Sequence, residues 1–286
     1  MNKLKQVLKE HYSMLDVSIK QGNGHNINSQ NYIVTSNDKK YYLKTQDLKA
    51  TKIKQIEAMD ICYQYDMLVP EIIKTTEDSL FITRNNILFF LTKFYDGTFC
   101  SFNSKEIYSA GEQLTILNNR LKSTHIVLER TRLYDNLTEE QLNDIKQQTD
   151  DKKVLMLCEK LPILYKKISK ENNIQLVHLD YNLQNVLFKN NEVQVILDYG
   201  SIITESLTQS IAFGCDRFSR SKTNMLTFLR GCIDNGFSEN QLSCIPEYTI
   251  KEAVSRINYI LRTNTWSFDI DKHIKIIDRM EKLEWI

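Results

Sequence analysis

Three polar residues between positions 176 and 199 have the types and spacing needed to handle a nucleotide triphosphate. Asp180 is a carboxylate with no obvious partner, Asn185 is an amide five residues later, and Asp198 follows an apolar run. Mg²⁺ prefers a few hard oxygen ligands and keeps several waters, which suits Asn185 and Asp198. A hydroxyl that attacks phosphorus needs a separate acceptor for its proton, which suits Asp180. The set therefore predicts magnesium-dependent phosphoryl transfer.

The residues around this set predict a tight β-hairpin. Residues 186–197 contain two apolar runs rich in β-formers, separated by Asn190 and Asn191, which tolerate the positive φ angles of a short turn. Such a hairpin would bring Asn185 and Asp198 to neighbouring strand ends, within reach of one ion. Taken one at a time, the three polar residues of the set have a structural alternative, since each can simply cap a turn or end a strand.

Two short motifs in this region resemble those of a known fold. HLDYNLQN, residues 178–185, resembles the His-x-Asp-x-x-x-x-Asn catalytic loop of the protein-kinase-like fold, and residues 198–200 (Asp-Tyr-Gly) resemble its Asp-Phe-Gly metal-binding turn. The flanking residues, two β-formers before the histidine and VLF after the asparagine, are most similar to the aminoglycoside phosphotransferase and choline kinase-like family.

The resemblance implies a role for each residue of the set. Asp180 corresponds to the catalytic base, and Asn185 and Asp198 correspond to the magnesium ligands. His178 corresponds to a histidine that packs and hydrogen-bonds to hold the loop. Gln184 stands where the family often has a small or basic residue, a departure that we expect to be harmless.

The resemblance also implies an α+β fold with two lobes, which the length of 286 residues favours because this is long for a single core. Residues 1–95 would form a small nucleotide-binding lobe, a mainly antiparallel sheet with one helix. Residues 96–286 would form a larger, mostly helical lobe that carries the catalytic loop and the acceptor-binding region.

A polar segment with two glycines joins the first expected strands, residues 17–20 and 32–34. A glycine-bearing loop can fold backbone N–H groups over phosphates, so Gly22 and Gly24 are candidate nucleotide-binding residues. The alternative is that they only close a hairpin. Ile27 stands where protein kinases have a third glycine, which weakens a protein-kinase interpretation.

Lys44 ends an expected strand at residues 41–44 and shares a face with aromatic residues. A lysine on an inward face needs an anionic partner, because an isolated buried ammonium is very costly. By resemblance Lys44 binds the nucleotide phosphates and pairs with a glutamate on the next helix, expected at residues 48–65, where Glu57 is the best candidate. The alternative is that both are ordinary solvated charges.

The segment after the expected strand at residues 87–93 contains a glycine and resembles the hinge between the lobes, where adenine bonds to the backbone. By resemblance Phe94 and Tyr95 line the nucleotide site. Plain hydrophobic packing explains the same two aromatic residues equally well.

Beyond residue 103 the pattern turns helical. Asn103 begins a helix with a sequence that resembles a capping box, an interruption is expected at Pro162, and the chain beyond residue 200 reads as helical almost to its end. Asp216 stands where the family often has an aspartate that braces the catalytic loop. The alternative is a helix-surface carboxylate paired with Arg217 or Arg220.

Composition excludes several classes of protein. The 37 basic and 36 acidic residues leave a net charge of +1, which argues against a nucleic-acid binder. The longest apolar run, residues 87–91, is far too short to span a bilayer, and the first residues lack the apolar core of a signal peptide. The six cysteines form no Cys-x-x-Cys pair. We expect reduced thiols and a cytoplasmic protein.

The sequence therefore predicts a small-molecule kinase that uses ATP (or GTP) and Mg²⁺ to phosphorylate a hydroxyl group. The acceptor would be an amino sugar or aminoglycoside, choline or ethanolamine, or a similar alcohol. No nucleic-acid or membrane partner is expected, and the protein would be a monomer or a homodimer. Two alternatives stay open, a protein Ser/Thr kinase-like enzyme and an inactive nucleotide-binding module. The Ala-Pro-Glu segment expected of a protein kinase does not occur beyond residue 200.

Overall fold

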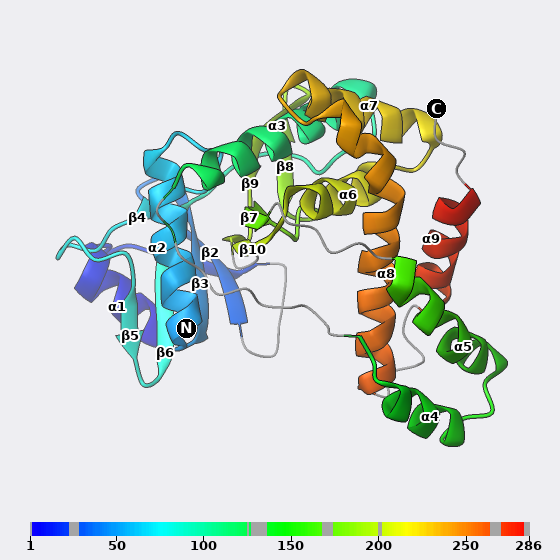
Figure 1. Ribbon diagram of the computed structural model, residues 1–286. Helices are drawn as coiled ribbons and strands as arrows, with labels where there is room; N and C mark the ends of the chain where they lie inside the picture. The colour runs from blue at the N-terminus through cyan, green and yellow to red at the C-terminus, as the bar shows by residue number, and fades with distance from the viewer. Residues whose placement is uncertain are drawn as a thin grey trace.

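A computed structural model describes residues 2–22, 29–124, 126, 136–167, 174–199, 202–263 and 270–282. An antiparallel sheet with helices on both faces comes first in the chain, and a mostly helical part follows (Figure 1). This arrangement confirms the predicted α+β fold.

The sheet is antiparallel throughout, with strand order β1-β2-β3-β6-β4 and β5 paired to β6. Its strands are β1 (Ser18–Gln21), β2 (Ser29–Ser36), β3 (Lys39–Asp47), β4 (Ile72–Ile73), β5 (Ile82–Arg84) and β6 (Ile87–Lys93). The register places Lys44 on β3 between Asn31 on β2 and Phe90 on β6. Lys44 therefore stands near the middle of the sheet, where both neighbouring strands support it.

Alternation along the strands separates two apolar faces. On one face, Leu43 and Leu91 are fully buried with Val7 of α1 (Asn2–Tyr12). On the opposite face, Phe90 packs with Ile56 of α2 (Ala50–Gln64). Because Lys44 pairs with Phe90, its side chain shares the face that α2 covers.

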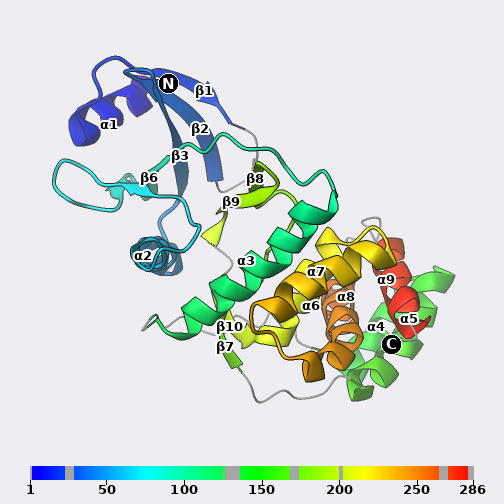
Figure 2. The ribbon, with the colours of Figure 1, turned by 90° about the horizontal axis from the view of Figure 1, so that it is seen from above.

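The helical part contains two small β-ladders and a bundle of helices. The ladders pair β7 (Ile174–His178) with β10 (Ile202–Ser206), and β8 (Val186–Lys189) with β9 (Glu192–Ile196). The α-helices that the structure describes here are α3 (Ser104–Lys122), α4 (Glu139–Gln147), α5 (Lys152–Lys167), α6 (Leu207–Phe218), α7 (Lys222–Asp234), α8 (Ile245–Arg262) and α9 (Ile270–Lys282). Helix α3 runs between the sheet and the remaining helices (Figure 2).

Helix α3 begins as the sequence predicts. The side chain of Asn103 accepts a hydrogen bond from the backbone N–H of Glu106. The carboxylate of Glu106 accepts hydrogen bonds from the backbone N–H and the hydroxyl of Ser101 rather than from the backbone of Asn103. The first turn of α3 is therefore tied to the segment that arrives from the sheet.

Two details of the helical part contradict the sequence-based expectation. Helix α5 continues through Pro162, because Leu161 and Leu164 on both sides of the proline are buried in a core shared with α8, and this packing outweighs the lost hydrogen bond. Residues 202–206 form a strand, β10, because their β-branched residues pair with β7.

Among the described helices, none has both the length and the apolarity to cross a membrane.

Helices α3 and α7 cross so closely that two glycines are required. A Cβ atom on Gly111 would lie 2.0 Å from the backbone oxygen of Phe228, and one on Gly231 would lie 2.2 Å from the backbone oxygen of Tyr108. Because these obstacles are backbone atoms, the helices can accommodate a methyl group only by moving apart.

We expect Gly111→Ala to lower the free energy of unfolding by about 3 kcal/mol, the upper part of the range for overpacked cores. The measurement is urea denaturation followed by circular dichroism. Lys105→Ala, at an exposed position of the same helix, is the matched control and should change stability little. Equal stability of the Gly111 variant and the wild type would contradict the close crossing.

Candidate functional site

The predicted hairpin is formed, and it brings the candidate metal ligands together. Asn190 and Asn191 have φ angles of 55° and 67°, as the predicted turn requires. At the open end of the hairpin, the backbone N–H of Leu197 donates to the backbone oxygen of Asn185 at 2.6 Å. Asp198, the next residue, is therefore held beside Asn185.

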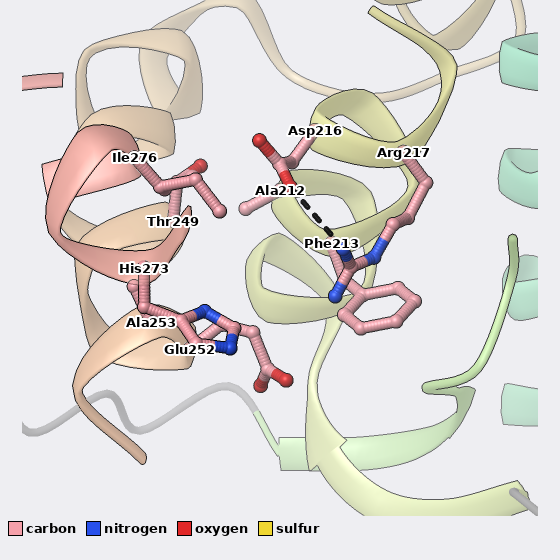
Figure 3. A pocket seen from close by; sticks show the side chains of 9 residues that line it. All are labelled: Ala212, Phe213, Asp216, Arg217, Thr249, Glu252, Ala253, His273 and Ile276. Carbon is pink, nitrogen blue, oxygen red and sulfur yellow. Dashed lines mark ion pairs between the residues drawn. The ribbon is translucent and has the colours of Figure 1, made fainter. Parts of the chain in front are cut away.

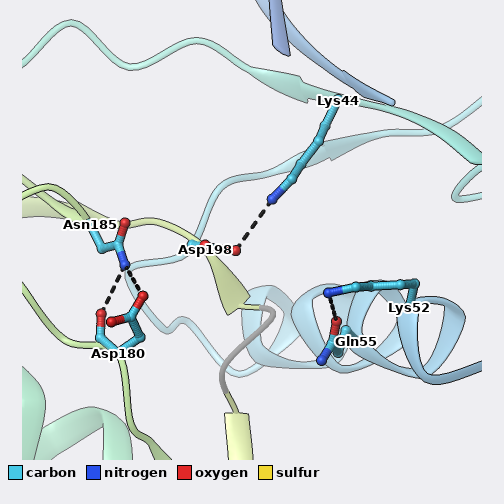
Figure 4. A network of polar contacts seen from close by, with 6 residues as sticks. All are labelled: Lys44, Lys52, Gln55, Asp180, Asn185 and Asp198. Atoms are coloured by element: carbon cyan, nitrogen blue, oxygen red, sulfur yellow. Dashed lines mark hydrogen bonds and ion pairs between the residues drawn. The ribbon is translucent and has the colours of Figure 1, made fainter. Parts of the chain in front are cut away.

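Two amide side chains hold the carboxylate of Asp180. The Nδ2 atom of Asn185 donates to Oδ2 of Asp180 at 2.9 Å (Figure 4). The Nδ2 atom of Asn182 donates to Oδ1 of Asp180 at 2.8 Å. Asn185 thereby turns its amide oxygen away from Asp180. Asn182 was not predicted from the sequence, although a second amide inside the catalytic-loop motif was a visible signal.

Asp198 pairs with Lys44, which comes from the sheet 154 residues earlier in the chain. The Nζ atom of Lys44 lies 3.3 Å from Oδ1 of Asp198 (Figure 4). Partial burial alone would raise the pKa of the Asp198 carboxyl, but the charge and hydrogen bond of Lys44 outweigh burial and lower it. Asp198 also has a φ of 55°, a left-handed conformation uncommon for residues other than glycine. The pair joins the sheet to the hairpin.

His178 lies behind the loop and does not face solvent. Its exposed fraction is 0 %, and its ring meets those of Tyr181 and Tyr199 edge-on, with centroids 6.2 Å and 5.5 Å away. Burial lowers the pKa of its imidazole, against the opposing charges of Asp180 and Asp198. A buried imidazole with a lowered pKa stays neutral at pH 7. His178 therefore packs behind the loop as an uncharged ring.

The predicted ion pair between Lys44 and Glu57 is not formed. Glu57 lies on the exposed side of α2, and Lys44 pairs with Asp198 instead. The side chains of α2 that face Lys44 and Asp198 are Lys52 and Gln55 (Figure 4), and Nζ of Lys52 donates to Oε1 of Gln55 at 3.1 Å. The physical reason is the rotation of α2, which packing of its apolar residues against the sheet decides.

The remaining nucleotide-binding candidates lie around the end of β1 and the end of β6. The backbone N–H of Gly22 donates to the backbone oxygen of Asn31, so Gly22 extends the β1–β2 ladder. Gly24 lies outside the described residues. Phe94 is half-buried, and its backbone N–H donates to the backbone oxygen of Lys40 on β3. Tyr95 accepts a hydrogen bond at its hydroxyl from the backbone N–H of Glu71, which ties this segment to the start of β4.

Asp216 belongs to a different cavity. Its carboxylate pairs with Arg217 at 3.8 Å, one of the pairings expected for it. Together with Glu252 and His273 it lines a cavity of about 10 Å³ between α6, α8 and α9 (Figure 3). A space of this size holds a single water molecule, so it is too small for an acceptor.

The residues brought together suit a magnesium nucleotide. Asp198 and the amide oxygen of Asn185 could supply hard oxygen ligands of the kind that Mg²⁺ prefers. Lys44 supplies a positive charge at the same place, and Asp180 supplies a carboxylate held by neutral amides rather than by a cation. The donor set therefore fits one divalent ion and a triphosphate.

Comparison by sequence gives no match, either to known protein families or to curated proteins. Comparison by structure gives clear similarity. A spectinomycin phosphotransferase in complex with ADP and spectinomycin is 17 % identical, with a TM-score of 0.75, and the match covers 99 % of this chain and 98 % of that one.

Two further solved structures show the same fold. An amicoumacin kinase in complex with AMP-PNP and Ca²⁺ is 14 % identical, with a TM-score of 0.67 and coverage of 92 % of this chain and 86 % of that one. A microcompartment-associated aminopropanol kinase is 11 % identical, with a TM-score of 0.66 and coverage of 98 % and 94 %. The chain thus has the fold of the aminoglycoside phosphotransferases and related small-molecule kinases.

Proposed function

We propose that this protein transfers the γ-phosphoryl group of ATP (or GTP) to a hydroxyl group of a small molecule. The observation that carries the proposal is the convergence of Lys44, Asp180, Asn185 and Asp198, which come from the sheet, the catalytic loop and the hairpin, at one place. The similar solved structures support it, since two of them contain the nucleotides ADP and AMP-PNP.

Each residue has a chemical role in this proposal. Asn185 and Asp198 hold Mg²⁺, and Lys44 binds the nucleotide phosphates. When bound, the metal neutralises charge on the phosphate oxygens. Asp180 accepts the proton of the acceptor hydroxyl, whose oxygen forms the new bond to phosphorus while the nucleoside diphosphate leaves.

Nucleotide would bind to the lobe of residues 1–95, with Gly22 and Phe94 at its edges, and the acceptor to the lobe of residues 96–286. The acceptor we propose is a small hydroxylated molecule such as an amino sugar, an aminoglycoside, choline or ethanolamine. Spectinomycin in the complex of the similar phosphotransferase supports an acceptor of this size. The six cysteines, all within the described residues, form no disulfide with one another, and we place the protein in the cytoplasm, where thiols stay reduced.

The experiment is ATP consumption with a panel of amino sugars, aminoglycosides and small amino alcohols, each with Mg²⁺ and with a chelator. A member of the panel should stimulate ADP formation, and the chelator should abolish the stimulation. A thermal shift with MgATP but not with Mg²⁺ alone should accompany it. Unchanged melting with MgATP and no stimulation by any member would contradict the proposal.

Asn182 provides a test of how Asp180 is positioned. Asn182→Ala removes the amide that holds Oδ1 of Asp180, so we expect kcat to fall by about ten- to a hundredfold, a typical cost of losing a supporting contact. Affinity for MgATP should not change, because Asn182 does not contact Lys44 or Asp198. Steady-state kinetics with the best acceptor of the panel would measure both parameters. An unchanged kcat would exclude this role.

A further inference from the structure

Helix α2 presents a lysine to the proposed nucleotide site where a carboxylate was expected. Figure 4 shows Lys52 pointing from α2 toward the space that Lys44 and Asp198 also face. Nζ of Lys52 is held at 3.1 Å by the amide oxygen of Gln55, one turn further along the helix. Lys52 is half-buried. It is therefore a positioned cation rather than a freely moving surface lysine.

The charges around Lys52 support this interpretation. Burial lowers the pKa of its ammonium, the charge of Lys44 lowers it further, and the opposite charge of Asp198 acts against both. The charges of both Lys44 and Asp198 therefore act on the ammonium group of Lys52. The first turn of α2 contains no acidic residue that would neutralise it.

The balance of charge differs from the predicted one. Lys44 paired with Glu57 would leave the carboxylates of Asp180 and Asp198 as two uncompensated negative charges at the site. With Lys52 facing Asp198 beside Lys44, two ammonium groups balance these two carboxylates instead. A triphosphate is strongly anionic, and ammonium groups bind phosphate oxygens through charge-assisted hydrogen bonds. A site with this balance does not repel the triphosphate, and its two ammonium groups can bind phosphate oxygens before a metal ion contributes.

We propose that Lys52 is a second phosphate-binding cation, which contacts the nucleotide together with Lys44 and makes nucleotide binding less dependent on the metal. This inference rests on the proposed function, since it assigns a further ligand within the same nucleotide site. Gln55 orients the ammonium without neutralising it. A carboxylate at position 55 would pair with Lys52 and compete with the phosphates.

The test is calorimetric titration of the full chain with ATP, in excess Mg²⁺ and in chelator. Lys52→Gln should weaken ATP binding by roughly ten- to a hundredfold, the loss expected for a hydrogen bond to a charged group, and the loss should be larger in chelator. Lys54→Gln removes the same charge from an exposed position of the same helix. Its affinity for ATP should stay within about twofold of the wild-type value. Lys52→Arg should restore most of the binding.

Gln55→Glu tests the inference by adding a negative charge next to Lys52 rather than by removing the positive charge of Lys52. It should weaken ATP binding in the same direction as Lys52→Gln, although Lys52 itself is intact. Circular dichroism melting of each variant would establish that it is folded.

A folded Lys52→Gln that binds ATP as tightly as Lys54→Gln would overturn the inference. The proposed function would survive that result if MgATP still bound to the wild type and not to Asp198→Ala. Absence of ATP binding to the wild type would overturn both.

Discussion

Asp180→Asn should lower kcat by about two to four powers of ten while leaving the affinity for MgATP within about twofold. The carboxylate is the proposed proton acceptor, and an amide cannot take that proton. Asn182 and Asn185 both donate to Asp180, so one amide-to-amide contact will be unfavourable in the variant, but neither Lys44 nor Asp198 touches Asp180 directly. The nucleotide site should therefore stay intact.

The measurement is single-turnover phosphoryl transfer with an acceptor from the panel, alongside calorimetric titration with MgATP. Asp234→Asn is the matched control, since Asp234 bonds to Tyr108 and Arg230 away from the loop. Its rate should equal that of the wild type. Full activity of Asp180→Asn would rule this residue out as the base, and a loss of MgATP binding would assign it to the nucleotide site instead.

Asp198→Ala should abolish the contribution of Mg²⁺ to nucleotide binding, with a loss of roughly a hundredfold in affinity for MgATP. Removal of the carboxylate takes away a proposed metal ligand and also frees Lys44, its partner at 3.3 Å. In chelator, the substitution should no longer weaken ATP binding. Metal-free ATP should bind to the variant at least as tightly as to the wild type, because Lys44 no longer has to leave a carboxylate before it can bind phosphate.

Calorimetric titration of wild type and variant, each with Mg²⁺ and with chelator, gives the four affinities needed. Asp216→Ala is a useful comparison, since it removes a carboxylate that pairs with an arginine in a separate cavity. Its affinity for MgATP should match that of the wild type. If Mg²⁺ changed the ATP affinity of Asp198→Ala as much as that of the wild type, Asp198 would not be a metal ligand.

Local patterns predicted the hairpin and its turn well. The φ angles of Asn190 and Asn191 follow from residue type, and the β-rich runs on both sides leave few other conformations. Once the hairpin forms, Asn185 and Asp198 must lie at its open end. Contacts determined within one supersecondary unit are therefore readable from the sequence.

Contacts between units were harder to predict. The partner of Lys44 depends on how α2 is rotated against the sheet and on how closely the hairpin approaches it. A helical stripe shows which residues are apolar, but it does not say which of the flanking polar residues faces the site. Glu57 was therefore preferred, whereas Lys52 and Gln55 occupy that face and Asp198 takes the lysine.

Two elements show tertiary packing overriding local preference. Helix α5 passes through Pro162 because its leucines are buried against α8. Strand β10 exists because β7 is available to pair with it, and a short β-branched segment directly before a helix gives only a weak signal by itself. In both cases the deciding partner is a separate element of the chain.

The most direct test of the central claim is the binding of Mn²⁺, as a paramagnetic substitute for Mg²⁺, measured by electron paramagnetic resonance in the presence of AMP-PNP. We predict nucleotide-dependent Mn²⁺ binding that is lost in Asp198→Ala and in Asn185→Ala, while Asp216→Ala binds Mn²⁺ as the wild type does. Binding that persists unchanged in both site variants would contradict the claim that Asn185 and Asp198 hold the metal of a nucleotide site.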